Sequence, residues 1–162
     1  MQRLANRDDL HSVYAIYMDE TVVRFLGYDP MPLEQFSLIF DELLRSKAFF
    51  VHLSQEEIAG FYRISRYPGR AAHVAQLGTL AVAPHFQGKG VAQAMLAEAI
   101  QTLEAMGVRR VELIVEADNS RGLAFYQRLG FEIEGRLRQF YKRSDEQEYI
   151  DDFIMAKLLE EV

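Results

Sequence analysis

The sequence predicts an α/β chain with a sheet of six to seven strands and helices on both faces. Three observations predict this class: helical periodicity in residues 1–45, strand-like segments between residues 47 and 83, and alternating helix and strand patterns from residue 88. A run of strands followed by such alternation is typical of a mixed sheet. The chain has no internal repeat or low-complexity linker, and 162 residues fit a single domain over residues 1–162.

The first 45 residues predict a short strand and two helices. The strand covers residues 1–4, and Asn6 is a candidate N-cap for the first helix. The apolar positions of that helix follow the i, i+3, i+4, i+7 pattern and are Leu10, Val13, Tyr14 and Tyr17. A second helix follows Pro30 and Pro32, because proline at a helix start loses no hydrogen bond. One side of this helix carries Leu33, Phe36, Phe40, Leu43 and Leu44.

The middle of the chain changes to the strand period. Strands are predicted at residues 47–53, 57–65 and 73–83, with a turn at residues 54–57 between the first two. The stretch from Thr79 to Val82 is apolar enough for an interior strand, and Pro84 ends it.

The C-terminal part alternates between helix and strand. Residues 88–107 predict the clearest helix, and Gly107 suits the left-handed position after its end. A strand at residues 109–115 and a helix from residues 118–120 to about Leu129 follow. Residues 131–140 and 148–158 then predict two strands, which would form a hairpin turning at residues 143–146. The apolar stripe of the long helix consists of Ala92, Met95, Leu96, Ala99, Ile100, Leu103 and Met106.

Composition and charge exclude several classes of protein. Hydrophobic residues make up 49% and charged residues 26%, so we expect a sizeable core. The absence of cysteine excludes disulfides, thiolate zinc sites and cysteine nucleophiles. A net charge of -6 argues against a nucleic-acid partner, which needs a basic surface. The acidity favours solubility and, to a smaller degree, cationic substrates such as amines.

The sequence also predicts where the protein is located. Residues 1–9 lack the apolar segment of a signal peptide, and no apolar run approaches the ~20 residues that cross a bilayer. We therefore expect a cytoplasmic protein without a membrane partner.

The most informative stretch runs from Leu80 to Ala92, where a strand enters a glycine-containing turn and then a long helix. Unpaired N–H groups and the positive end of the helix dipole make such a helix start an anion site. Gly88 and Gly90 let phosphates approach the backbone, and Lys89 adds positive charge.

Two better-known phosphate motifs do not fit this turn. A P-loop needs Ser or Thr after the lysine, whereas Gly90 follows Lys89. The dinucleotide fingerprint needs a third glycine where Gln93 stands. Taken alone, the turn is equally compatible with anion binding and with a purely structural role.

The residues around the turn resemble a known family. Gln87-x-x-Gly90-x-Ala92 resembles the Gln/Arg-x-x-Gly-x-Gly/Ala pyrophosphate loop of the GCN5-related N-acetyltransferase (GNAT) family, and it follows a Leu-x-Val-x-Pro strand end as in that family. The segment from Asn119 to Phe131 resembles the family's Asn-x-x-Ala-x-x-x-Tyr-x-x-x-Gly-Phe pattern, with Gly122 at the alanine position. The order of elements agrees over nearly the whole chain, so the resemblance implies the GNAT fold with a mixed, mostly antiparallel sheet.

The resemblance implies an acyltransferase that uses acetyl-CoA and no metal. The acetyl group passes to a primary amine by direct attack in a ternary complex. Pantetheine would hydrogen-bond to residues 80–82 in a cleft beside the 109–115 strand, and the Val82 N–H would polarise the thioester carbonyl. The implied acetyl-CoA-binding residues are Leu80, Ala81, Val82, Gln87, Gly88, Lys89, Gly90, Val91, Ala92, Asn119 and Tyr126.

Tyr126 occupies the position of the family's general acid, which protonates the leaving thiolate. From spacing alone, Tyr126 fits a core tyrosine better than an acid, and the motif around it reverses this preference. Asn119 also fits a plain N-cap. The general base stays open. Many family members carry an acidic residue where this chain has Gln76, and the other candidates are His73, Glu112, Glu116 or a water chain. A missing base slightly favours α-amines, which are less basic than side-chain amines.

A narrower resemblance concerns the acceptor. The segments at residues 73–75, 130–135 and 149–155 resemble a bacterial branch that contains L-amino-acid N-acetyltransferases. The alternatives are a protein N-terminal acetyltransferase of the ribosomal-protein type, a polyamine acetyltransferase and a regulatory acetyl-CoA-binding module. A homodimer through the C-terminal strands is common in such folds. The acceptor would be bound by Arg24, Arg66, Arg138, Phe25, Tyr28, Tyr141 and Tyr149.

Overall fold

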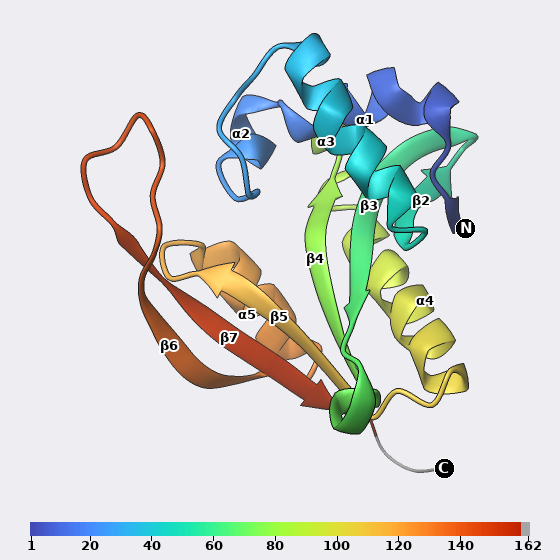
Figure 1. The fold of residues 1–162 in the computed structure, drawn as a ribbon, viewed down its shortest axis with the longest axis vertical. Helices are drawn as coiled ribbons and strands as arrows, with labels where there is room; N and C mark the ends of the chain where they lie inside the picture. Colours follow the sequence, from blue (N-terminus) through green and yellow to red (C-terminus); the bar gives the residue numbers. More distant parts are fainter. Residues whose placement is uncertain (160–162) are drawn as a thin grey trace. The chain divides into compact units, whose positions relative to one another are not determined.

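The computed structural model describes residues 1–159 and confirms the predicted fold class, with a mixed, mostly antiparallel arrangement of seven strands (Figure 1). The chain divides into two compact units. The first consists of Met1–Ser65 and Gly78–Thr102, and the second of Arg66–Leu77 and the chain from Leu103 onward. Strand β4 (Val74–Val82) therefore contributes its end to the first unit and its beginning to the second.

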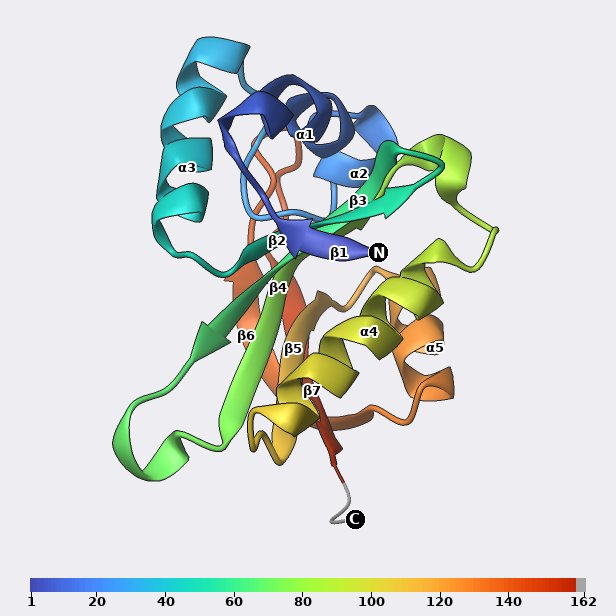
Figure 2. The same cartoon turned by 90° about the vertical axis from the view of Figure 1, so that its right-hand side faces the viewer.

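In the first unit, β1 (Gln2–Leu4), β2 (Phe49–Ser54), β3 (Glu57–Arg66) and the end of β4 are neighbours in that order. Figure 2 shows β1 alongside β2, with which it pairs antiparallel from Gln2↔His52 to Leu4↔Phe50. Strands β2 and β3 form an antiparallel hairpin that turns at residues 55 and 56, as predicted.

The helices of the first unit largely confirm the prediction. The first helix, α1 (Leu10–Tyr17), begins later than Asn6, because Asn6 caps a single 3-10 turn at Arg7–Asp9. Helix α3 (Leu33–Arg45) follows Pro32 and buries Phe36, Phe40 and Leu43. A further short helix, α2 (Glu20–Val23), was not predicted, because four residues carry no measurable periodicity.

Aromatic rings form much of the core of the first unit. Phe36 lies 5.1 Å from Tyr17 and 6.3 Å from Phe40, measured between ring centroids. Phe49 lies 5.5 Å from Phe61. These rings join α1 and α3 to the β2–β3 hairpin, so apolar contacts hold this layer of helices on the sheet.

Helix α4 (Val91–Ala105) is shorter than the predicted 88–107. The predicted start is wrong because Gly88 and Gly90 have φ values of 74° and 77°, which do not occur in a right-handed helix. Met106 was expected in the apolar stripe but lies beyond the helix and is 60% exposed. Gly107 has the predicted left-handed conformation, with a φ of 85°.

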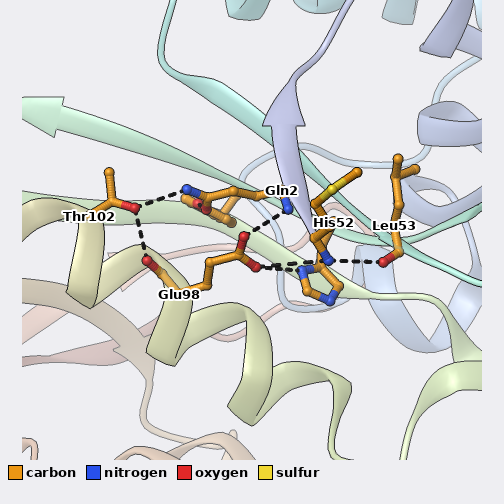
Figure 3. A network of polar contacts seen from close by, with 7 residues as sticks. Gln2, His52, Leu53, Glu98 and Thr102 are labelled. Atoms are coloured by element: carbon orange, nitrogen blue, oxygen red, sulfur yellow. Dashed lines mark hydrogen bonds and ion pairs between the residues drawn. The ribbon is translucent and has the colours of Figure 1, made fainter.

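A polar network ties β1 to α4 within the first unit (Figure 3). The Gln2 N–H donates to Oε1 of Glu98 at 3.0 Å, and the Gln2 side chain donates to Oγ1 of Thr102 at 3.1 Å. The Thr102 hydroxyl donates in turn to the Glu98 carbonyl, and the Tyr62 hydroxyl donates to the Gln2 side chain. His52 Nδ1 lies 3.4 Å from Oε2 of Glu98. These contacts position the short edge strand β1, which has few ladder bonds of its own.

In the second unit, the beginning of β4, β5 (Arg110–Glu116), β7 (Ile150–Leu158) and β6 (Glu132–Tyr141) are neighbours in that order. β4 and β5 pair in parallel from Val74↔Arg110 to Gln76↔Glu112. β5 and β7 pair antiparallel from Arg110↔Leu158 to Glu116↔Asp152. The predicted β6–β7 hairpin is confirmed, although its connection is wider than residues 143–146. Helix α5 (Ser120–Arg128) also lies in this unit.

Candidate active site

The turn between β4 and α4 has an open backbone surface. The Ala83 N–H donates to the Ala59 carbonyl at 2.8 Å, and the Gln87 side chain donates back to the Val82 carbonyl at 3.1 Å. These bonds fix where the chain leaves β4. A Cβ atom added to Gly88 or Gly90 would meet nothing within 4 Å, so a ligand can reach the main chain at both positions.

The start of α4 has unpaired donors beside this surface. The Ala94 N–H makes the first helical bond, to the Gly90 carbonyl at 3.0 Å. The N–H groups of Val91, Ala92 and Gln93 therefore have no acceptor within the helix. The exposed Lys89 adds a cation, whose Nζ lies 5.9 Å from the Phe86 ring. Main-chain donors, the positive helix end and Lys89 together fit the charge of a pyrophosphate.

The end of β4 is irregular before this turn. Thr79 has a φ of 49°, which is uncommon for a β-branched residue and interrupts the regular strand. Ala81 and Val82 are buried, while Leu80 is half-buried. A Cβ atom at Gly60 of β3 would lie only 2.7 Å from the Ala81 carbonyl oxygen, so glycine allows the close approach of these two strands. The cleft and the pantetheine contacts expected along residues 80–82 stay predictions.

Asn119 and Gly122 define the start of α5 in the second unit. Asn119 is the N-cap, and its side-chain oxygen accepts the Gly122 N–H at 3.0 Å. A Cβ atom at Gly122 would lie 2.6 Å from Nδ2 of Asn119. The departure from the family's alanine thus leaves room for the capping side chain to fold over the helix start. The N-cap role of Asn119 is confirmed, and its contact with a coenzyme stays a prediction.

Tyr126 lies on α5 between two phenylalanines. Its ring centroid is 5.3 Å from Phe125 and 5.8 Å from Phe131, both in edge contact. Burial of the hydroxyl raises the pKa of Tyr126 above its usual value, and the Glu116 carboxylate raises it further. The phenol therefore stays protonated at neutral pH, which an acid needs. Tyr126 as a whole is half-buried and no residue of α5 is fully buried, so the residue packs at the edge of the core and its catalytic role stays a prediction.

Glu116 ends β5 and stands opposite Asp152 on β7. Both are buried, with 8% of Glu116 and 3% of Asp152 exposed. Burial raises the pKa of Glu116 to about 7; Asp152 contributes to the rise, whereas Arg143 and Asn119 oppose it. Burial also raises the pKa of Asp152 to about 6. Within residues 1–159, Oδ1 of Asp152 has no hydrogen-bond partner.

Arg143 brings a positive charge to this cluster from the β6–β7 connection. Its guanidinium is 5% exposed and donates to both oxygens of Asp118, at 2.8 and 3.2 Å. It also donates to Oε2 of Glu146 at 3.4 Å and lies 5.0 Å from the Tyr141 ring centroid. Sequence patterns singled out neither Asp152 nor Arg143, because their importance depends on strand pairing and burial.

The other candidates for the base are less suited. Gln76 pairs with Glu112 across β4 and β5 and is half-buried, but an amide cannot take the proton. Glu112 accepts the Tyr67 hydroxyl at 2.5 Å on one oxygen and Arg110 at 3.0 Å on the other. Its carboxylate is therefore already engaged by two donors. His73 is exposed, and its carbonyl accepts the Arg109 N–H at 2.8 Å.

The residues expected to bind the acceptor are distributed over both units. Arg24, Phe25 and Tyr28 belong to the first unit, and the Arg24 guanidinium lies 6.0 Å from the Phe25 ring centroid. In the second unit, Arg66 donates to the Ala72 carbonyl at 2.7 Å. Arg138 and Tyr149, also in the second unit, are exposed, and Tyr141 is half-buried. The structure gives each of these side chains a place, and their joint role in binding stays a prediction.

Residues 1–159 contain neither a candidate metal site nor a candidate membrane-spanning helix. No group of three or more histidine, aspartate or glutamate side chains is arranged to hold a metal ion there. None of the helices in that part of the chain has both the length and the apolar character to cross a membrane.

Comparison with known proteins adds the family. The profile of the Acetyltransferase (GNAT) family matches residues 5–131. A mycothiol acetyltransferase of Brachybacterium faecium is 41% identical over 87 residues, which is 53% of this chain and 26% of that protein. An L-amino acid N-acetyltransferase of Escherichia coli is 36% identical over 90 residues, 55% of this chain and 54% of that protein. The matched segments thus span about a quarter and about half of these relatives.

Solved structures share the fold over the full length. The ribosomal-protein-alanine N-acetyltransferase of Brucella melitensis superposes with a TM-score of 0.79 at 24% identity, covering 98% of this chain and 99% of that one. A putative phosphinothricin N-acetyltransferase superposes with a TM-score of 0.80 at 23% identity, covering 99% of both chains. At this identity the likeness concerns the fold alone.

Proposed function

The chain belongs to the Acetyltransferase (GNAT) family, and we propose that it transfers the acetyl group of acetyl-CoA to a primary amine in a ternary complex. The observation that carries this proposal is the turn from β4 to α4, where Gly88 and Gly90 expose the backbone beside unpaired helix donors. A pyrophosphate matches this surface in charge and in donor geometry.

The residues proposed to bind acetyl-CoA come from three segments of the chain. In the proposal, residues 87–92 bind its pyrophosphate, and residues 80–82 bind its pantetheine arm through main-chain groups. Asn119 and Tyr126 are the other residues of the proposed set. Acetyl-CoA supplies an acetyl group activated as a thioester, and the chain supplies positioning, which can contribute several kcal/mol by making the attack effectively unimolecular.

Tyr126 would act as the general acid. Its raised pKa means that the phenol holds a proton to give when the carbon–sulfur bond breaks. After the transfer, the phenolate would regain a proton from the newly acylated nitrogen. No metal enters this scheme.

The proposed acceptor is a small molecule with an α-amine, such as an L-amino acid. The support is the E. coli relative, which is named for this activity and is 36% identical over 90 residues. Mycothiol precursors, protein N-termini and polyamines are the competing acceptors. A cytoplasmic location, a single domain over residues 1–162 and a homodimer through the C-terminal strands stay predictions.

The first experiment measures binding and turnover separately. Acetyl-CoA at 100 times its Kd should raise the free energy of unfolding by about 2.7 kcal/mol, seen as a higher Tm. Release of free thiol is then followed with a panel of amino acids, polyamines, peptides and aminosugar thiols. Stabilisation followed by thiol release with α-amines supports the proposal. Stabilisation without release for any amine indicates a regulatory module, and no stabilisation removes the coenzyme site.

A second experiment tests the acid. Tyr126→Phe should lower kcat by about 10²–10⁴, the usual contribution of general acid–base catalysis, and leave the Kd of acetyl-CoA nearly unchanged. Tyr14→Phe is the matched control, because its hydroxyl donates to the Met31 carbonyl at 2.9 Å within the first unit. An unchanged kcat in Tyr126→Phe would leave Tyr126 with a packing role only.

A further inference from the structure

Two carboxylates face each other at the end of β5 in the second unit. Glu116 and Asp152 are directly opposed in the antiparallel β5–β7 pair. Opposed residues place their side chains on the same face of a sheet, with Cβ atoms about 4.5–5.5 Å apart. Two buried like charges at such a separation are costly unless one of them holds a proton. This pair therefore has the arrangement of a proton-binding site.

The surroundings of the pair are unbalanced in charge. Arg143 is bonded to Asp118 and Glu146, so its positive charge is shared with these two carboxylates. Asn119, Tyr126 and Tyr141 are the other polar groups whose charges or hydrogen bonds act on Glu116 or are acted on by it. Among residues 1–159, Glu116, Asp152, Asp118 and Glu146 provide four carboxyl groups around the one guanidinium of Arg143. The Asp151 carboxylate also acts on Asp152 but is paired with Arg136. Such an excess of acid attracts an ammonium group.

An unpaired side-chain oxygen lies in the same cluster. Oδ1 of Asp152 is buried and has no hydrogen-bond partner within residues 1–159, although buried polar atoms are nearly always paired. The neighbouring Tyr126 separates the roles of the pair. Both carboxyl groups are buried, and Glu116 is the one whose charge raises the pKa of the Tyr126 hydroxyl, so Glu116 is the carboxylate beside the proposed acid.

We propose that Glu116 is the general base that takes the proton from the acceptor's ammonium group, and that Asp152 is a positioning residue that keeps Glu116 ready to accept it. This inference rests on the proposed acetyl transfer. Glu116 supplies the general base that the amide Gln76 cannot supply. The base Glu116 and the acid Tyr126 are also neighbours, because the Glu116 charge acts on the Tyr126 hydroxyl.

The proton and bond balance of the step is complete. A proton passes from the ammonium nitrogen to a Glu116 oxygen, which leaves a neutral amine with a free electron pair. The nitrogen attacks the thioester carbon, so a carbon–nitrogen bond forms and the carbon–sulfur bond breaks. The sulfur takes the Tyr126 proton, and the acylated nitrogen returns one to Tyr126. Glu116 then releases its proton to water, so each turnover yields one proton, one amide and one thiol.

The environment tunes Glu116 for this task. A carboxylate with an ordinary pKa near 4.3 is a weak base toward an ammonium group. Burial and the charge of Asp152 raise the pKa of Glu116 to about 7, close to the operating pH at which a general base is most efficient.

The test uses four variants of the full chain. Glu116→Gln and Asp152→Asn are compared with Glu132→Gln, whose side chain is exposed on β6. Thiol release is measured from pH 5.5 to 9 with the best acceptor of the panel. Unchanged stabilisation by acetyl-CoA shows that each variant is folded. Glu116→Asp, which keeps the carboxylate on a shorter side chain, is a rescue variant for a loss of stability.

For the wild type, kcat/KM should fall about tenfold per pH unit below the pKa of the base. This decline at low pH is the acid limb of the pH profile. Glu116→Gln should lower kcat by about 10²–10⁴ and abolish the acid limb. Glu116→Asp should keep part of the wild-type kcat and part of the acid limb. Asp152→Asn should move the limb to lower pH, because the like charge that raises the proton affinity of Glu116 is gone. A limb that came from the acceptor's own ammonium would not move in this variant.

The outcomes separate this inference from the function on which it rests. A wild type that binds acetyl-CoA but acetylates no amine overturns the proposed function and the base together. A wild type that turns over, with kcat and acid limb unchanged in Glu116→Gln, overturns only the base. An Asp152→Asn limb that stays in place removes Asp152 from the inference.

Discussion

Each compact unit contains a polar cluster around a glutamate, Glu98 in the first unit and Glu116 in the second, and the two clusters differ in how their charges are compensated. In the first unit, Glu98 accepts the Gln2 N–H, and Thr102 and Tyr62 satisfy the Gln2 side chain (Figure 3). His52 contributes a ring nitrogen 3.4 Å from Glu98, at ion-pair distance but outside hydrogen-bond geometry. This network joins β1 to α4.

In the second unit, Glu116 and Asp152 face each other without mutual compensation. The pKa values of both carboxyl groups are raised, to about 7 and about 6, chiefly by burial. Arg143 offsets part of the negative charge through Asp118 and Glu146. In the first network the Gln2 and Glu98 groups have hydrogen-bond partners, although Nδ1 of His52 has none within residues 1–159, and such a network contributes to stability and specificity of packing. Buried carboxyl groups with pKa values near neutrality are typical of sites that move protons.

The largest expected effect is on the free energy of unfolding when Arg143, the cation of the second cluster, is replaced. Arg143→Met should lower the free energy of unfolding by about 3 kcal/mol, the lower end for a broken buried pair, because Arg143 is buried but its partners Asp118 and Glu146 are 36% and 28% exposed. Arg7→Met is the matched control, because the Arg7 side chain is 82% exposed and lies 3.4 Å from Asp41. Removal of such a surface pair should cost less than about 1 kcal/mol. Urea unfolding measures both, and equal losses would mean that Arg143 does not compensate a buried cluster.

The two clusters should respond to pH in opposite directions. The raised pKa values of Glu116 and Asp152 mean that the folded state binds more protons than the unfolded state between about pH 4 and 7. The free energy of unfolding therefore falls as pH rises through that window. The fall is about 1.4 kcal/mol per unit of difference between the folded and unfolded pKa, or about 3 kcal/mol for Glu116.

His52 should show the reverse. Burial is the main cause that lowers the pKa of His52. The contribution of neutral His52 to the free energy of unfolding is therefore present above about pH 6.5 and is lost as pH falls below that value. Urea unfolding from pH 4 to 8 of Glu116→Gln and His52→Gln, each compared with the wild type, separates the two slopes. Slopes of the same sign would show that the clusters do not differ in the way described.

The smallest expected effects are of opposite sign at pH 8. Glu98→Ala should lower the free energy of unfolding by about 1 kcal/mol, because the part-buried Gln2 N–H loses its acceptor. Asp152→Asn should raise it by about 1–3 kcal/mol, because a buried charge with an orphan oxygen is replaced by a neutral side chain. Glu104→Ala on the exposed face of α4 and Asp145→Asn in the β6–β7 connection are the controls. A stabilising Glu98→Ala or a destabilising Asp152→Asn contradicts the comparison.

Much of the fold could be predicted because its signals are local. The periodicity of Phe36, Phe40 and Leu43 predicted α3, and the order of elements was right apart from the four-residue α2. The start of α4 was placed too early, because an apolar period says nothing about the φ angles of Gly88 and Gly90. The loop at residues 87–92 was located by its glycines, and Tyr126 and Asn119 by their spacing in a motif.

The sequence by itself determined the helices, the strands, the glycine turn before α4 and the family resemblance. These depend on residues close together in the chain, whose spacing fixes backbone geometry. Only the tertiary structure decided that Glu116 and Asp152 are opposed, that Arg143 is buried beside Asp118, and that Glu112 is already bonded to Tyr67 and Arg110. The reason is physical: the proton affinity of a carboxylate depends on its burial and on neighbouring charges, and strand register brings those neighbours from distant parts of the chain.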